Sequence, residues 1–118
     1  MVTKYPSEHQ EQKLLVNWFR LQYPQYMIFS IPNGGTRNKI EAKKLKDEGL
    51  MAGVPDMIIC TPEKTIFVEM KKQKGGTLSA KQKEIHDKLN NLGYEVIVGY
   101  GFKDAKYKID EAIKRGKE

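Results

Sequence analysis

The sequence predicts a mixed α/β fold, in which helices lie on the faces of a sheet with both parallel and antiparallel strands. Apolar residues recur at helical spacing in several segments, and short apolar runs rich in β-branched residues lie between them. The order of these segments is α-β-α-β-β-α-β-α, so that a hairpin is followed by a helical crossover. If the strands over residues 65–70 and 94–99 run parallel, the crossover between them is expected to be right-handed.

The first helix is expected over residues 7–23. Ser7 is a good N-cap, Gln10 completes a capping-box pattern, and Pro24 ends the helix. The residues expected to face the core recur at helical spacing and are Leu14, Leu15, Trp18 and Leu21. A strand over residues 26–32 follows.

A short basic helix is expected over residues 38–49, with Gly49 as its stop. Its apolar face is thin and consists chiefly of Ile40, Ala42 and Leu45. The next helix, over residues 79–93, has Ser79 as its cap and Gly93 as its stop. The apolar stripe of this helix is expected to consist of Ile85, Leu89 and Leu92.

A strand over residues 94–100 and an amphipathic helix over residues 103–116 complete the chain. The apolar side of the last helix consists of Ala105, Ile109, Ala112 and Ile113. A length of 118 residues fits one compact domain, so residues 1–118 are expected to form a single unit.

The charge balance is basic. The chain has 21 Lys and Arg against 15 Asp and Glu, a net charge of +6, which favours an anionic partner such as nucleic acid, although a solvated lysine-rich surface has the same composition. The single cysteine, Cys60, permits no intrachain disulfide and fits a reducing compartment. Neither a signal peptide nor an apolar stretch of the ~20 residues that a membrane helix needs is seen. A cytoplasmic protein without membrane contact is expected, bacterial or phage-encoded.

Charged residues interrupt the two apolar runs between Gly53 and Lys72. A turn at TPEK, with Pro62 at its second position, predicts a symmetric hairpin in which paired residue numbers add to a constant. In that register Asp56 faces Glu69 across the hairpin, with β carbons ~5 Å apart unless a bulge intervenes. Lys71 lies on the same face as Glu69, because side chains alternate along a strand.

Two carboxylates placed directly opposite each other repel and normally destabilise a sheet. The arrangement is explained if a cation lies between them, and carboxylate ligands without sulfur or imidazole suit Mg²⁺ or Mn²⁺. Lys71 is then placed to reach a phosphate or a metal-bound water. Ile66, Val68 and Met70 fill the other face of this strand. The competing interpretation is that Asp56 is a turn residue after Pro55, and that Glu69 and Lys71 form the solvated face of an edge strand.

Helix residues supply further candidates for this site. Glu8 shares the apolar side of the first helix and is a candidate third carboxylate, while Glu11 is the competing choice; a first-turn acid also complements the helix dipole. Gln82 lies three residues before the apolar Ile85, so it is either a partner of the site carboxylates or only part of a capping box with Ser79.

Possible nucleic-acid contacts are less sharply marked. Asn33, Gly34 and Arg37, with Lys39, could cradle a phosphate, or could form a simple loop. Lysines that could contact a nucleic-acid backbone electrostatically are Lys39, Lys43, Lys44, Lys46, Lys71, Lys72 and Lys74. His9 and His86 are isolated in the sequence and have no zinc-ligand spacing.

GVPD followed by a strand and FVEMKK resembles the PD-(D/E)xK nuclease motif. With SEHQEQ, PNGG, KKLKDEG before GVPD, and GGTLSAKQ after it, the pattern is similar to that of the VRR-NUC family over most of the chain. The resemblance implies a restriction-endonuclease-like core and Mg²⁺-dependent cleavage of DNA, with Mn²⁺ as a substitute. It also implies a homodimer acting on branched DNA such as four-way (Holliday) junctions, without a small-molecule cofactor.

Residue by residue, the resemblance implies that Asp56 and Glu69 bind the metal, with the Met70 carbonyl as a further ligand. Lys71 corresponds to the catalytic lysine, Gln82 to the glutamine after the motif, and Glu8 to the helix glutamate. The alternatives are a nuclease of unbranched or single-stranded DNA, a non-catalytic nucleic-acid-binding module, and a structural component of a larger replication or packaging complex.

Overall fold

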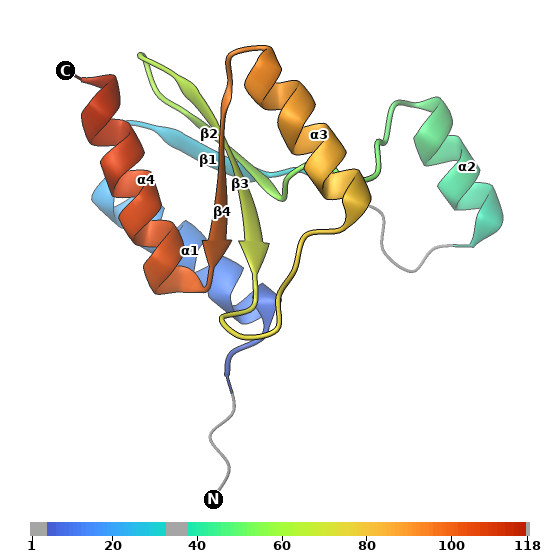
Figure 1. Cartoon of the computed structure of the whole chain (residues 1–118), viewed down its shortest axis with the longest axis horizontal. Helices are drawn as coiled ribbons and strands as arrows, with labels where there is room; N and C mark the ends of the chain where they lie inside the picture. The colour runs from blue at the N-terminus through green and yellow to red at the C-terminus, as the bar shows by residue number, and fades with distance from the viewer. Residues whose placement is uncertain (1–4, 33–37, 118) are drawn as a thin grey trace, which may run out of the picture.

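In the computed structural model, residues 5–32 and 38–117 are described (Figure 1). The elements follow the predicted order α-β-α-β-β-α-β-α. In chain order they are α1 (Glu8–Gln22), β1 (Met27–Ser30), α2 (Lys39–Asp47), β2 (Met57–Cys60), β3 (Thr65–Lys71), α3 (Ala80–Asn91), β4 (Glu95–Tyr100) and α4 (Phe102–Gly116).

The described strands form one mixed sheet in the order β1-β2-β3-β4. β1 pairs antiparallel with β2, β2 pairs antiparallel with β3, and β3 pairs parallel with β4. α3 makes the connection between the two parallel strands, as the sequence predicted. The mixed α/β class is therefore confirmed.

Helices lie on both faces of this sheet (Figure 1). Alternate residues of β3 are fully buried against α1 and α4, and the same cluster contains apolar residues of β1, β2 and β4; its β3 members are Ile66, Val68 and Met70. The opposite face of β3 carries Glu69, which contacts side chains of α3. Removal of apolar surface from water at ~25 cal/mol per Å² is the main stabilising term for such a core. The face of β3 that carries Glu69 is therefore the face that α3 covers.

The buried side of α1 differs from the expected one. Leu15 and Phe19 are fully buried, whereas Leu21 is 85% exposed and Leu14 is also exposed. Glu11 takes the place of Leu14 in the core, because its carboxylate accepts hydrogen bonds inside the protein. The Ser7–Gln10 capping box is present as predicted. The helix therefore begins where expected but is rotated about its axis relative to the predicted stripe.

α2 stands away from the sheet, on the far side of α3 (Figure 1). Every residue of α2, all of which the structure describes, is at least partly exposed, and Ile40 is 74% exposed. The thin apolar face predicted for this helix therefore contributes no buried residue. Asn38 caps the helix through its side chain, which accepts a hydrogen bond from the Glu41 amide.

The residues that α4 buries are all apolar, whereas α3 buries one apolar and one polar residue. In α4 the predicted residues Ala105, Ile109, Ala112 and Ile113 are all buried. In α3 Ile85 is buried as expected, and the second buried residue of the helix is His86. Leu92, the C-cap residue just after the helix, is exposed. None of the helices in the described ranges is long and apolar enough to cross a membrane.

Candidate active site

The hairpin of β2 and β3 has the register that the sequence predicted. Met57 pairs with Val68 and Cys60 pairs with Thr65, and no extra residue interrupts the ladder between them. Thr61 and Lys64 close the turn through a hydrogen bond from the Thr61 amide to the Lys64 carbonyl, 3.0 Å long. Asp56 directly precedes β2, so the same register sets it opposite Glu69.

The Asp56 carboxylate is held at this position by the backbone of β3. Its Oδ2 accepts a hydrogen bond of 2.7 Å from the Met70 amide. The Met70 side chain points to the other face, into the core. This bond joins the segment just before β2 to the end of β3, and it engages only one of the two Asp56 carboxylate oxygens. The role of the Met70 carbonyl as a metal ligand stays a prediction.

Glu69 is a buried carboxyl group, with only 2% of the residue exposed. Its burial, and then the hydrogen bonding and negative charge of Asp56, raise the pKa of Glu69 to about 9. The Lys71 ammonium opposes this rise in the pKa, and the charge of Glu8 adds a little to it. Asp56, Glu69, Lys71 and Glu8 are therefore close enough to interact electrostatically.

Two side chains of α3 contact the Glu69 carboxyl group. Gln82 Nε2 lies 3.4 Å from Glu69 Oε2, and His86 Nε2 lies 3.2 Å from Glu69 Oε1. Gln82 also forms the capping box, since its Oε1 accepts a hydrogen bond of 2.9 Å from the Ser79 amide. Gln82 therefore makes both of the predicted contacts: its Oε1 takes part in the capping box, and its Nε2 lies beside the Glu69 carboxyl group.

Glu8 and Glu11 differ in what surrounds them. Glu11 is buried, and its carboxylate accepts hydrogen bonds from the Phe102 amide (3.2 Å) and from Gln73 Nε2 (3.1 Å). These bonds tie α1 to the start of α4 and to the loop after β3. Both oxygens of Glu11 are thereby used inside the protein. Glu8 is only partly buried and acts on Glu69 through its charge, which makes it the better placed of the two helix acids.

Two glycines let the backbone approach these side chains closely. Gly53 has a φ of +87° and lies against the first turn of α3, where a β carbon would come within 2.9 Å of the Lys81 carbonyl oxygen. A β carbon on Gly76 would come within 2.9 Å of the Lys71 β carbon. The segment that delivers Asp56 and the loop that follows Lys71 are therefore both closely packed.

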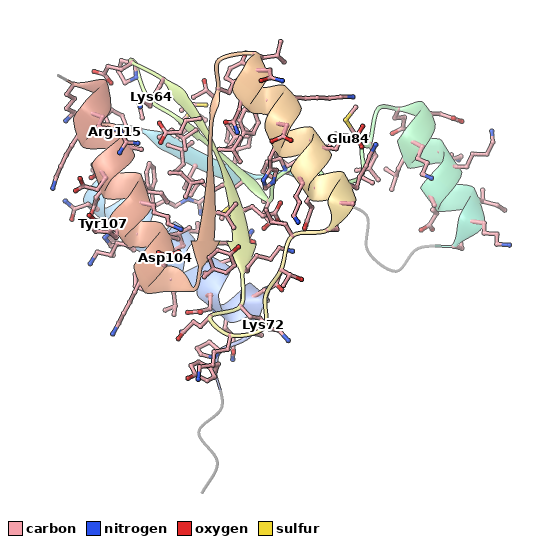
Figure 2. All side chains as sticks on the ribbon, viewed as in Figure 1. Lys64, Lys72, Glu84, Asp104, Tyr107 and Arg115 are labelled. Atoms are coloured by element: carbon pink, nitrogen blue, oxygen red, sulfur yellow. The ribbon has the colours of Figure 1, made fainter. Side chains whose placement is uncertain are left out.

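The predicted nucleic-acid contacts fall into separate regions. Lys72 and Lys74 are exposed in the loop after β3, and Lys74 lies over the Tyr5 ring, 5.6 Å from its centroid. Figure 2 shows Lys72 at the end of the sheet where β3 ends, and Lys64 and Arg115 at the opposite end.

Lys39 and Lys43 are exposed on α2, and Lys43 pairs with Asp47 at 3.5 Å. α2 stands apart from the loop after β3 (Figure 1), so the structure does not bring these two lysines together with Lys72 and Lys74. Asn33, Gly34 and Arg37 lie outside the described residues.

The two carboxylates are suited to a hard divalent cation. They supply only oxygen ligands, and a cation bound to both would favour the ionised form of Glu69, whose pKa is raised by burial and by the neighbouring Asp56. Among residues 5–32 and 38–117, no group of three or more His, Cys, Asp or Glu side chains forms a ligand set. A cation at Asp56 and Glu69 would therefore complete its shell with backbone oxygen and water, as Mg²⁺ commonly does.

The fold and these side chains define a nuclease-type domain. The family model described as the VRR-NUC domain matches residues 3–103, and the protein belongs to that family. A solved structure of a VRR-NUC domain protein matches at a TM-score of 0.77 and 27% identity, covering 95% of this chain and 92% of that one. A second, of a VRR-NUC domain, matches at 0.65 and 20%, covering 89% and 97%, and has the same fold. No curated protein matches the chain.

Sequence reasoning missed two residues of this region. His86 was set aside because no zinc spacing surrounds it, yet it is buried against Glu69. Its position one helical turn after Gln82 was the available signal, since residues four apart share a face of a helix. Gln73 binds Glu11 across the loop after β3, and nothing in its local sequence marks that contact.

Proposed function

We propose that this protein is a metal-dependent DNA endonuclease that hydrolyses phosphodiester bonds at Asp56, Glu69 and Lys71. The observation that carries the proposal is the buried Glu69, whose carboxyl group faces Asp56 and has a raised pKa. Buried carboxyl groups with strongly perturbed pKa values cluster at functional sites, and this one lies beside an ammonium group.

Asp56 and Glu69 would hold Mg²⁺, for which Mn²⁺ would substitute. When bound, such an ion polarises a phosphoryl oxygen and lowers the pKa of a coordinated water. Lys71 is on the same face of β3 and places a positive charge where a substrate phosphate accumulates negative charge during hydrolysis. Gln82 and the Met70 amide keep the two carboxylates in place through the contacts described above. Glu8 supplies further negative charge at the edge of the site.

The substrate we propose is DNA, with a preference for branched forms such as four-way junctions, and the active form is a homodimer. A net charge of +6 favours a polyanion. The exposed Lys72 and Lys74 lie in the loop that directly follows β3, the strand that carries Glu69 and Lys71. A homodimer would present two such sites, as paired cuts across a junction require.

A cleavage assay tests this function. The full chain is incubated with a four-way junction, linear duplex and single-stranded DNA, in Mg²⁺, in Mn²⁺ and in EDTA. We expect junction cleavage in either metal and none in EDTA, and we expect Asp56→Asn and Glu69→Gln to remove it. Glu84→Gln is the matched control, because Glu84 is an exposed glutamate of α3 that pairs only with neighbouring lysines of that helix among the described residues (Figure 2).

Full activity in EDTA, or in Asp56→Asn, would contradict the proposal. Binding of DNA without cleavage in either metal would instead indicate a non-catalytic binding module. Equal cleavage of all three substrates would leave the metal-dependent nuclease in place and remove the preference for branched DNA.

A further inference from the structure

The Glu69 carboxyl group is bound on both oxygens by one face of α3. Gln82 and His86 are four residues apart, so their side chains project from the same side of the helix toward β3. Gln82 Nε2 lies 3.4 Å from Oε2 of Glu69, and His86 Nε2 lies 3.2 Å from Oε1. α3 is therefore the element that sets the orientation of this carboxyl group.

The two contacts are of different quality. The Gln82 amide is anchored by the capping box, because its Oε1 accepts from the Ser79 amide, but its distance to Glu69 is long for a hydrogen bond. The His86 contact is shorter and lies deeper, since only 6% of His86 and 2% of Glu69 are exposed. In a dry location a hydrogen bond to a charged group contributes more than it does at the surface.

The chemistry of the pair fixes the direction of the hydrogen bond in the ionised site. A carboxylate only accepts hydrogen bonds, so His86 donates through Nε2 whenever Glu69 is ionised. A neutral imidazole with its hydrogen on Nε2 meets this requirement. The pair then needs no net charge on the imidazole to hold the carboxylate.

We infer that His86 is a positioning residue for Glu69, which holds the carboxylate in the orientation that binds the divalent cation. The inference rests on the proposed metal-dependent function and adds a residue to it. In this role His86 acts through Glu69, not directly on DNA or on the reacting phosphate.

A space-filling role alone does not explain a histidine at this position. An apolar side chain of similar size would fill the same space between α3 and β3 without the cost of burying a polar ring. The contact that the imidazole makes and a leucine lacks is the one to Oε1 of Glu69. Loss of hydrogen bonds to metal-ligating side chains typically reduces metal affinity or activity by ~10–100-fold.

Titration calorimetry with Mn²⁺, in the absence of DNA, tests the inference without relying on catalysis. The chains compared are the wild type, His86→Leu, His86→Gln and Ile85→Val. Leucine fills the space without a donor, whereas the amide of glutamine can place a donor close to the position of Nε2. Ile85→Val perturbs packing at a buried neighbour on the same helix that has no polar side-chain group.

We expect His86→Leu to weaken Mn²⁺ binding about 10–100-fold, His86→Gln to recover most of the affinity, and Ile85→Val to bind like the wild type. In the cleavage assay, His86→Leu should need more Mg²⁺ for half-maximal rate but approach the wild-type rate when Mg²⁺ is saturating. Thermal unfolding in EDTA identifies any variant that is not folded.

The outcomes separate this inference from the proposed function. If the wild type neither binds Mn²⁺ nor cleaves DNA, the proposed function fails and the inference with it. If the wild type binds and cleaves while folded His86→Leu binds Mn²⁺ equally well, only the inference is overturned. Equal loss of affinity in His86→Leu, His86→Gln and Ile85→Val would also overturn it, because general loosening of α3 would then be the cause.

Discussion

Gly53 lies directly against Lys81 in the first turn of α3. A β carbon on Gly53 would come within 2.8 Å of the Lys81 γ carbon and 2.9 Å of its carbonyl oxygen. The φ of Gly53 is +87°, a backbone conformation that residues other than glycine rarely adopt. The close approach sets the path of the chain just before Asp56, so the start of α3 and the first acid of the site are positioned together.

Gly53→Ala is therefore expected to destabilise the protein and to reduce cleavage. Strained backbone of this kind costs ~1 kcal/mol or more, and the contact with the Lys81 carbonyl adds to it. Urea unfolding measures the stability. Gly93→Ala is the matched control, because Gly93 also has a positive φ, +97°, but a β carbon there would meet nothing within 4 Å. Equal losses of stability and activity in the two variants would contradict the role given to the close approach.

Glu69→Gln is expected to stabilise the metal-free protein at neutral and higher pH. The folded protein keeps the Glu69 proton up to a pKa of about 9, whereas the unfolded chain releases it near the ordinary value of 4.5. The stability contributed by this group is therefore present below pH 4.5 and is lost as the pH rises toward 9. In EDTA the melting temperature of Glu69→Gln should exceed that of the wild type at pH 8, with a smaller gap at pH 5. The same gap at both pH values would refute this assignment.

Lys71→Ala should separate catalysis from metal binding. The ammonium group is expected to act on the substrate phosphate, so its loss should reduce the cleavage rate at saturating Mg²⁺ by about 100-fold or more. Mn²⁺ binding measured by calorimetry should be retained, because Lys71 is not a ligand. An undiminished rate, or a loss of rate that extra Mg²⁺ restores, would show that Lys71 acts on the metal or not at all.

The two acids of α1 should behave differently when substituted. Glu11→Leu leaves the Phe102 amide and Gln73 without their acceptor, so a loss of ~1–3 kcal/mol in the free energy of unfolding is expected. Glu8→Gln should leave urea unfolding nearly unchanged and reduce cleavage. Reversed results would assign the catalytic part to Glu11.

The proposed homodimer can be tested directly by measuring the molecular mass in solution. Light scattering at micromolar concentration should give twice the 13.6 kDa of one chain. A mass of 13.6 kDa both with and without junction DNA would rule out the dimer while leaving the catalytic residues untouched.

The parts of the fold that local rules determine were predictable from the sequence. The hairpin register follows from the turn at Pro62 and pairs Met57 with Val68 as predicted. Asp56 lies one residue before this ladder, and its carboxylate interacts with Glu69. Capping boxes at Ser7 and Ser79 likewise fixed the starts of α1 and α3. In each case the determining contacts are made by residues only a few positions apart or symmetric about one turn.

Two of the errors arose where tertiary hydrogen bonds outweigh hydrophobicity. Leu14 was expected in the core, but the core position belongs to Glu11, whose burial is compensated by the Phe102 amide far along the chain. His86 was set aside for the same reason, since its partner Glu69 is on another element. Apolar periodicity gives no account of a buried polar side chain whose partner comes from elsewhere in the sequence.

The most direct test of the central claim is a crystal structure of the full chain soaked in Mn²⁺, with an anomalous difference map. We predict a peak between the carboxylates of Asp56 and Glu69, with Lys71 on the same side of β3 and His86 still bonded to Glu69. A well-ordered site in which the two carboxylates bind other side chains, with no anomalous peak at a Mn²⁺ concentration that supports cleavage, would contradict the account.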